Sequence, residues 1–309
     1  MTMTDPATQA ARADAFRGSL DLELMSGDTG GEQIWGGRTD PLWRNMIGPF
    51  GGWIAALLAR AAERAAGAWL AGAGAGAGVV ATNTSFMGPI AEGPLRIVTR
   101  PLRVGRSVGF WQVDLIQAGE GGDVLCCQAT VTTGARRDTG DFTEPRSAMP
   151  AVPPAAEVRR FKPLPGMPGW FNAYDMRVVD GQPFSGAASS RGLTWLRHAP
   201  DTDHHAPDGS GDWPAGHEPA FDVAVIAGLA DAVFPRVFLL DRRPRPVSTV
   251  MLSTYIHARP EVLATIGGAP VLAEAVARRA HDGFFDQQVT LWDAAGTVLA
   301  TSEQLVWYK

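Results

Sequence analysis

Residues 48–64 read GPFGGWIAALLARAAER, and the spacing of their apolar side chains predicts a helix. Apolar side chains recur three and four residues apart at Phe50, Trp53, Ile54, Leu57 and Leu58, so they share one helical face. Pro49 suits the first turn, where its missing backbone N–H leaves no hydrogen bond unmade. We therefore expect a helix from Pro49 to Arg64 that buries one apolar face.

Four β-like runs follow this helix, and the same order of elements recurs in the second half of the chain. The first-half runs are Val79–Met87, Pro94–Val104, Val108–Gln117 and Val124–Thr133. In the second half, Phe221, Val225, Leu229 and Val233 mark a helix that Pro235 limits. The runs after it are Pro246–His257, Pro270–Arg278, Phe284–Trp292 and Val298–Tyr308, and Phe171–Val179 and Leu193–Arg197 precede it.

Short residue matches support an internal repeat. Val80-Ala81-Thr82 matches Val247-Ser248-Thr249, Gln112-Val113 matches Gln288-Val289, and Leu125 matches Leu299. A repeated helix followed by a four-strand meander predicts two similar units side by side, each wrapping a curved antiparallel sheet around its helix. The alternative is a pair of unrelated α+β domains.

A Pro-rich stretch from Glu144 to Gly169 lies at the midpoint of the chain. Such a composition resists helix and sheet and is typical of a connector. We predict an N-terminal unit over residues 1–145, a linker over 146–169 and a C-terminal unit over 170–309.

The composition narrows the class of protein. The 309 residues are 45% hydrophobic and 19% charged, which is ordinary for a globular chain. The net charge of -5 argues against a nucleic-acid surface, which needs a clustered positive field. The first fifteen residues lack the apolar core of a signal peptide, and the uncharged stretch 65–91 is too rich in Ala and Gly for a membrane span. We expect a cytoplasmic protein with no membrane span.

Three stretches of this sequence carry a resemblance to a known family. They are Gly48–Trp53, then Leu229-Ala230-Asp231 followed by Val247-Ser248-Thr249, and Leu291–Gly296 running into Leu299–Gln304. From about residue 16 to 309 the sequence resembles the acyl-CoA thioesterase II family and its thioesterase-like relatives. The resemblance implies an α+β fold, the double hotdog, with two tandem units, and a role in lipid metabolism. It also implies that the chemistry rests on Asp231 late in the second helix, Thr249 on the next strand and Gln304 on the last.

These residues have the chemistry that thioester hydrolysis requires. Asp231 would be the general base or would orient the water. Thr249 and Gln304 offer hydroxyl and amide groups that can hold water without competing for its proton. Gly51 and Gly52 open the first helix, whose unpaired N–H groups and dipole favour a developing oxyanion.

Each residue also has a purely structural interpretation. Asp231 could pair with an arginine, although its apolar neighbours predict burial and mark it as a site candidate. Thr249 could be only a β-former, and Gln304 only an exposed strand residue. Gly51-Gly52 could simply allow close packing. Four aromatic residues could line an acyl pocket or fill the core, namely Phe50, Trp53, Trp35 and Trp43.

A spacing argument predicts one composite site. Asp231 lies eight residues after Val223, near the start of the second helix, but eight residues after Gly52 the first helix has Arg60. Asp222-Val223 stands where the second helix would need its glycines. If the halves pack as a pseudo-dimer, Gly51 and Gly52 from the first half join the acid of the second, and the mirror site is inactive.

Hydrolysis of an acyl-CoA to a free acid and CoA, with no metal or organic cofactor, is the favoured function. One rival is an enoyl-CoA hydratase-like hotdog enzyme, which usually needs an Asp/His pair; His257 and His281 are its candidates. The other rival is a non-catalytic acyl- or acyl-CoA-binding protein of the same fold. Exposed sheet edges would allow a homo-oligomer.

Other features carry less weight. The loop Asp201–Pro219 holds His204, His205, Asp201, Asp203, Asp208 and Asp212, but their spacing fits no established metal-ligand pattern. Arg236, Arg242, Arg243 and Arg245 could meet CoA phosphates or simply be solvated. Cys126-Cys127 is interpreted as strand packing, and the sequence has no Gly-x-Ser-x-Gly elbow of a serine hydrolase.

Overall fold

The computed structural model describes residues 15–140, 142–199 and 220–309. The strands are β1 (Glu23–Gly27), β2 (Gln33–Arg38), β3 (Gly78–Phe86), β4 (Pro94–Val104), β5 (Val108–Gly119), β6 (Gly122–Gly134), β7 (Tyr174–Asp180), β8 (Gly192–His198), β9 (Val247–Ile256), β10 (Val271–Val276), β11 (Ala280–His281), β12 (Phe284–Trp292) and β13 (Val298–Tyr308). The α-helices are α2 (Ala15–Ser19), α3 (Gly51–Ala65), α4 (Gly67–Ala73), α5 (Val223–Leu229), α6 (Val237–Leu240) and α7 (Pro260–Ala264). Short 3-10 turns are η1 (Pro41–Trp43), η2 (Pro145–Ser147), η3 (Ala155–Glu157) and η4 (Gly169–Ala173).

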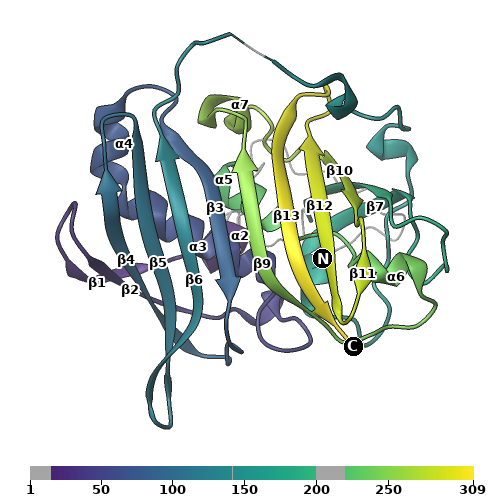
Figure 1. The fold of residues 1–309 in the computed structure, drawn as a ribbon, viewed down its shortest axis with the longest axis horizontal. Coiled ribbons are helices and arrows are strands. Elements are labelled where there is room, and N and C mark those ends of the chain that lie inside the picture. Colours follow the sequence, from purple (N-terminus) through teal and green to yellow (C-terminus); the bar gives the residue numbers. More distant parts are fainter. Residues whose placement is uncertain (1–14, 141, 200–219) are drawn as a thin grey trace, which may run out of the picture.

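The strands form one antiparallel sheet in the order β1-β2-β4-β5-β6-β3-β9-β13-β12-β10-β8-β7, with β11 beside β12 (Figure 1). Counted outward from the central β3–β9 pair, the first half follows the order β6, β5, β4, β2, β1 and the second half the order β13, β12, β10, β8, β7. The two halves thus have the same connectivity, which confirms the predicted double hotdog. They meet edge to edge, with Thr82 opposite Thr254. β3 pairs with β6 and not with β4, so the strands after each helix are not the simple meander that we expected.

The first predicted helix is α3, and it lies with α5 on one face of the sheet (Figure 1). Its apolar face is packed into the core, where Trp53 is fully buried. Much of the rest of the helix is alanine, including the buried Ala55, Ala56, Ala59 and Ala62. These small side chains allow α3 to lie close both to the sheet and to α5.

The second predicted helix is shorter than its apolar pattern, which extends to Val233. It ends at Leu229. The N–H of Asp231 bonds the Gly228 carbonyl at 3.3 Å and the N–H of Ala232 bonds the Leu229 carbonyl at 3.1 Å, so the chain tightens into a three-residue turn. Asp231 therefore lies just beyond the helix and not late within it.

The Pro-rich segment is more closely packed than a simple connector. Ser147 and Pro153 accept hydrogen bonds from the indole N–H groups of Trp292, at 2.8 Å, and Trp195, at 3.0 Å. Met149 and Val152 pack on the cluster of these two tryptophans and Leu272. This segment thus covers the face of the second-half sheet that α5 leaves open. The domain limits themselves stay a prediction.

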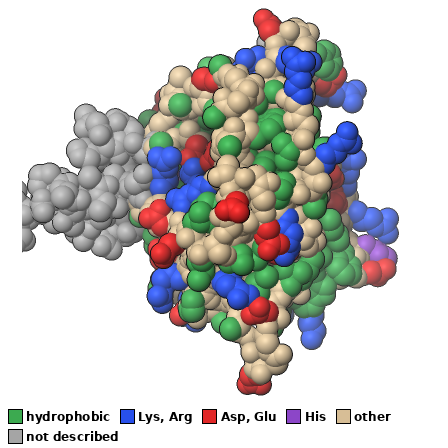
Figure 2. Space-filling view, turned by 90° about the vertical axis from the view of Figure 1, so that its left-hand side faces the viewer, with side chains coloured by type: hydrophobic (Ala, Val, Ile, Leu, Met, Phe, Trp, Pro, Cys, Tyr) green, Lys and Arg blue, Asp and Glu red, His purple; other side chains and the backbone are tan. Residues whose placement is uncertain are grey.

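The surface at the β1–β2 end of the sheet carries charges of both signs. Figure 2 shows acidic and basic side chains interspersed with apolar ones over this face. This agrees with the near balance of 27 basic and 32 acidic residues in the chain. Across the described ranges, the helices are all too short or too polar to cross a membrane.

Candidate active site

Asp231 and Gln304 meet in the core of the molecule. The Gln304 side-chain N–H on β13 donates to Oδ1 of Asp231 at 2.7 Å. Both residues are buried, with 8% of Asp231 and 3% of Gln304 exposed. The backbone N–H of Gly52, in the first turn of α3, also donates to the Asp231 carboxylate. The acid thus has one partner from each half of the chain.

The two glycines at the start of α3 allow this contact. A Cβ atom on Gly51 would lie 2.7 Å from Oδ2 of Asp231. A Cβ atom on Gly52 would lie 2.6 Å from the carbonyl oxygen of Gly228, in the last turn of α5. Both positions must lack a side chain, because the start of α3 runs directly against the end of α5.

Asp231 also completes the N-terminus of α3. The residue before the helix, Phe50, has no side-chain group that could accept a hydrogen bond from the first turn. A carboxylate at this position satisfies one of the free N–H groups and faces the positive end of the helix dipole. The acid of one half therefore caps the helix of the other.

Burial raises the pKa of Asp231 to about 7, against the hydrogen bonds from Gln304 and Gly52, which favour its ionised form. A carboxyl group with this pKa exists in both protonation states near neutral pH. It can accept a proton from water and release it again, which is the task of a general base.

Thr249 faces the same side of the sheet as Gln304 because of a bulge. Leu305 pairs with Met251 but Val306 pairs with Thr249, so Val250 is left without a partner. Val306 lies two residues beyond Gln304 and shares its face. Thr249 is half-buried, and within the described part of the chain its hydroxyl makes no hydrogen bond to Asp231 or Gln304.

The aromatic residues named from the sequence lie in the core. Phe50 packs over Gly52 and stacks on Trp170, with ring centroids 4.2 Å apart. Trp53 points toward α2, where its indole donates to the Ser19 hydroxyl at 2.9 Å. Their role in substrate binding stays a prediction.

Two buried polar residues near the site were missed from the sequence. The Tyr174 hydroxyl lies 3.2 Å from where a Cβ of Gly228 would be and has no hydrogen-bond partner among the described residues. Burial, with the charge of Asp231, raises its pKa well above the usual range. His198 stacks on Tyr174, neither ring nitrogen has a partner within the described part of the chain, and burial lowers its pKa to about 3. Both stand in strands whose sequence predicts only packing.

The other candidate residues lie elsewhere. His257 contacts the Thr301 hydroxyl at 3.1 Å and His281 pairs with Asp282 at 2.7 Å, so neither forms the Asp/His pair of a hydratase with Asp231. Burial raises the pKa of Cys127 to about 12, which does not suit a nucleophile. The histidines and aspartates of the loop 201–219 are outside the described residues. Within those residues no group of three or more potential ligands could hold a metal ion.

The predicted basic cluster after the second helix does not form as one surface. Arg236 is buried, with 3% exposed, and donates to backbone carbonyls that include Phe234 and Ala275. Arg245 is exposed and pairs with Asp241 at 2.5 Å. Arg236 is therefore no candidate for binding CoA phosphates.

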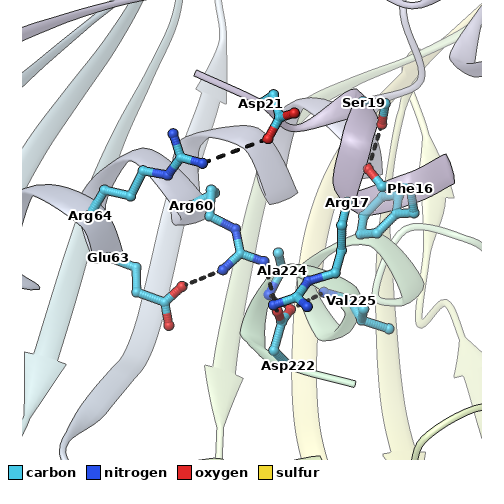
Figure 3. Close-up of polar contacts among 10 residues, drawn as sticks. All are labelled: Phe16, Arg17, Ser19, Asp21, Arg60, Glu63, Arg64, Asp222, Ala224 and Val225. Atoms are coloured by element: carbon cyan, nitrogen blue, oxygen red, sulfur yellow. Dashed lines mark hydrogen bonds and ion pairs between the residues drawn. The ribbon is translucent and has the colours of Figure 1, made fainter. Parts of the chain in front are cut away.

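The mirror position is filled by an ion pair. Asp222 caps α5, accepting from the backbone N–H groups of Ala224 at 2.9 Å and Val225 at 3.2 Å. Its second carboxylate oxygen lies 2.6 Å from Arg60 of α3 and 3.3 Å from Arg17 (Figure 3). At the candidate site, Asp231 faces the backbone N–H of Gly52. At the mirror position, Arg60 faces Asp222, which caps α5.

Comparison with known proteins agrees with this architecture. A solved protein of unknown function with a hot dog fold from Alicyclobacillus acidocaldarius is 30% identical, with 96% of this chain and 98% of that chain covered and a TM-score of 0.78. An acyl-CoA thioesterase II from Mycobacterium marinum is 18% identical over 95% of this chain and 98% of its own, with a TM-score of 0.65. A search of curated proteins gave no match.

Family models give the assignment. The model of the acyl-CoA thioesterase N-terminal domain matches residues 40–134, and that of the C-terminal domain matches residues 146–308. The second match alone covers more than half of the chain and includes Asp231, Thr249 and Gln304. The chain belongs to the acyl-CoA thioesterase family and is an enzyme that hydrolyses thioesters.

Proposed function

We propose that this protein hydrolyses an acyl-CoA with a water molecule that Asp231 activates and that Gln304 and Thr249 help to hold. The observation that carries the proposal is the position of Asp231, buried between the Gln304 amide and the start of α3. A proton acceptor with a pKa near 7, at a helix N-terminus that can stabilise an anion, suits attack of water on a thioester.

The reaction has two steps. Water attacks the thioester carbonyl carbon, a C–O bond forms, and Asp231 takes a proton from the water. The tetrahedral intermediate then collapses, the C–S bond breaks, and the proton passes from Asp231 to the sulfur of CoA. Since Gly52 donates its N–H to Asp231, we assign the oxyanion mainly to the N–H of Gly51, which has no intrahelical acceptor.

A panel of acyl-CoA thioesters with a free-thiol readout tests this proposal. The wild-type kcat/KM should rise with pH through about 7, because only the ionised carboxylate accepts a proton. Asp231→Asn should lower kcat by about 100-fold or more. The matched control is Glu303→Gln, which removes a charge from the exposed neighbour of Gln304 and should leave kcat unchanged.

The same panel separates the rivals. A non-catalytic binder would release no CoA from any thioester. A hydratase would add water to an enoyl-CoA, with loss of the absorbance of its conjugated double bond and no free thiol. The cytoplasmic location, the role in lipid metabolism and a homo-oligomeric state stay predictions from the sequence.

A further inference from the structure

A chain of hydrogen bonds runs from Asp231 to the backbone at the start of α6. Gln304 donates to Asp231 at 2.7 Å, and Gln287 on the neighbouring strand β12 donates to the Oε1 of Gln304 at 3.3 Å. The backbone N–H of Arg236 donates to the Oε1 of Gln287 at 3.2 Å. All of these residues are buried, with 2% of Gln287 exposed.

The polarity of this chain is set at its far end. A backbone N–H can only donate, so the Gln287 amide must turn its oxygen toward Arg236 and its NH2 group toward Gln304. Gln304 must then accept through its oxygen and turn its own NH2 group toward Asp231. If the Gln304 amide were reversed, its carbonyl oxygen would face the carboxyl group of Asp231. This arrangement is tolerated only when Asp231 is protonated.

The Arg236 backbone is itself fixed. Its guanidinium donates twice to the carbonyl of Phe234, and once each, at 3.4 Å, to the carbonyls of Ser190 and Ala275. These bonds join the turn after Asp231 to β10 and to the loop before β8. The backbone N–H of Arg236, which sets the direction of the Gln287 and Gln304 amides, is therefore fixed by contacts with three segments: the turn after Asp231, the loop before β8, and β10.

We propose that Gln287 is a positioning residue, which together with the Arg236 N–H keeps the NH2 group of Gln304 directed at Asp231. The inference rests on the proposed function, in which Asp231 must be ionised to accept a proton from water. It adds a residue that touches neither substrate nor acid and that selects the protonation state of the base.

Gln287→Glu tests the polarity. Once ionised, the carboxylate at position 287 still accepts from the Arg236 N–H but has no proton to donate, so Gln304 turns its NH2 group toward it and its oxygen toward Asp231. The carboxyl titration of Asp231, followed by NMR in protein with ¹³C-labelled aspartate and assigned with Asp231→Asn, should move up by about one pH unit. The acid limb of kcat/KM should move with it. Tyr174 and Arg236, the other ionisable residues that the described chain places at this turn, keep their side chains in this variant.

Gln288→Glu is the matched control. It adds the same charge one residue along β12, on the opposite face, where Gln288 contacts Glu303 and Arg278. Its Asp231 titration should stay within a few tenths of a unit of the wild type. An equal shift in both variants would mean that added charge, and not amide direction, moves the pKa, and would overturn the inference.

Gln287→Met covers the case in which Gln287→Glu does not fold. It has a similar volume but no donor or acceptor, so Gln304 loses its fixed direction and kcat should fall about tenfold with KM unchanged. Wild-type kcat in this variant overturns the inference, and so does a wild-type Asp231 titration in Gln287→Glu over the pH range in which the introduced carboxyl group is ionised. If Asp231→Asn keeps full activity while Gln287→Glu still shifts the titration, the proposed function fails and the positioning role of Gln287 stands.

Discussion

Arg60, in the second half of α3, pairs with Asp222 at the start of α5, while Asp231, just after α5, meets Gly52 at the start of α3. The two halves therefore meet in two contacts at helix starts, one at α3 and one at α5, with opposite chemistry. One contact holds a carboxyl group that can exchange a proton. The other holds an ion pair, which agrees with our proposal of a single site formed by both halves.

Arg60→Met should lower the stability of the fold and leave kcat unchanged. The side chains of Arg60 and Asp222 are 14% and 22% exposed, and removing Arg60 takes this partner from two half-buried carboxylates, Asp222 and Glu63. Since Arg17 and the α5 cap still contact Asp222, we expect the free energy of unfolding to fall by about 2 kcal/mol. Denaturant unfolding measures the loss, and kcat per folded molecule should match the wild type.

Arg44→Met is the control for that loss. Arg44 and Glu92 form an ion pair at 3.3 Å with 67% and 57% of their side chains exposed. Removing an exposed pair should change stability by less than about 1 kcal/mol. Equal losses for the two variants would mean that the Arg60 pair is no more than a surface contact.

Gly51→Ala should impair catalysis. Its Cβ would lie 2.7 Å from the Oδ2 atom of Asp231, so the carboxyl group must move or turn. Displacement of a reacting group by a fraction of an ångström to 1 Å can cost about 100-fold in kcat. Gly72→Ala is the matched control, because that glycine lies inside α4 and no described atom lies within 4 Å of its added Cβ. It should raise stability by about 0.5–1 kcal/mol and leave kcat unchanged.

Ionisation of Asp231 should make the fold less stable as the pH rises. Its pKa increases from 3.8 in the unfolded chain to about 7 in the fold, so the folded protein disfavours the charged form. The stabilisation is complete below the unfolded pKa and is lost as the pH rises through the folded one. Relative to Asp231→Asn, the wild type should lose on the order of 4 kcal/mol between pH 4 and pH 8.

Urea unfolding of both proteins across this pH range measures the difference. Groups other than Asp231 contribute equally to the two curves and cancel. A difference that does not depend on pH would place the folded pKa of Asp231 near its ordinary value, and would remove the physical reason for its function as a base near pH 7.

Much of the fold could be predicted because its signals are local. The apolar spacing of α3 and the long runs of β4, β12 and β13 belong to single segments, and their predicted bounds are close to the observed ones. β1 and β2 were missed: all five residues of β1 are exposed, so it has no alternating pattern, and β2 contains Gly36 and Gly37. A pattern argument cannot detect a strand that is stabilised mainly by its neighbour.

The site could be predicted in part. The juxtaposition of Asp231 and Gly52 followed from eight-residue spacings in two helices and the assumption of internal symmetry. Gln287 and Tyr174 could not be found, because their closeness to the site depends on the register of strands that are far apart in the sequence. The early end of α5 was also hidden, since the residues after it, Ala232 and Val233, continue a helical apolar pattern.

Thr249→Val should lower kcat about tenfold, because it removes a hydroxyl that would hold the attacking water and keeps the shape of the side chain. Thr249→Ser should keep most of the activity. Thr254→Val is the control on the same strand: the Thr254 hydroxyl is buried and has no hydrogen-bond partner in residues 15–140, 142–199 and 220–309, so its removal should raise stability by about 1 kcal/mol and leave kcat unchanged. If Thr249→Val is as active as Thr249→Ser, the water is held by Asp231 and Gln304 alone. The bulge at Val250 would then be a feature of strand geometry and not of the catalytic site.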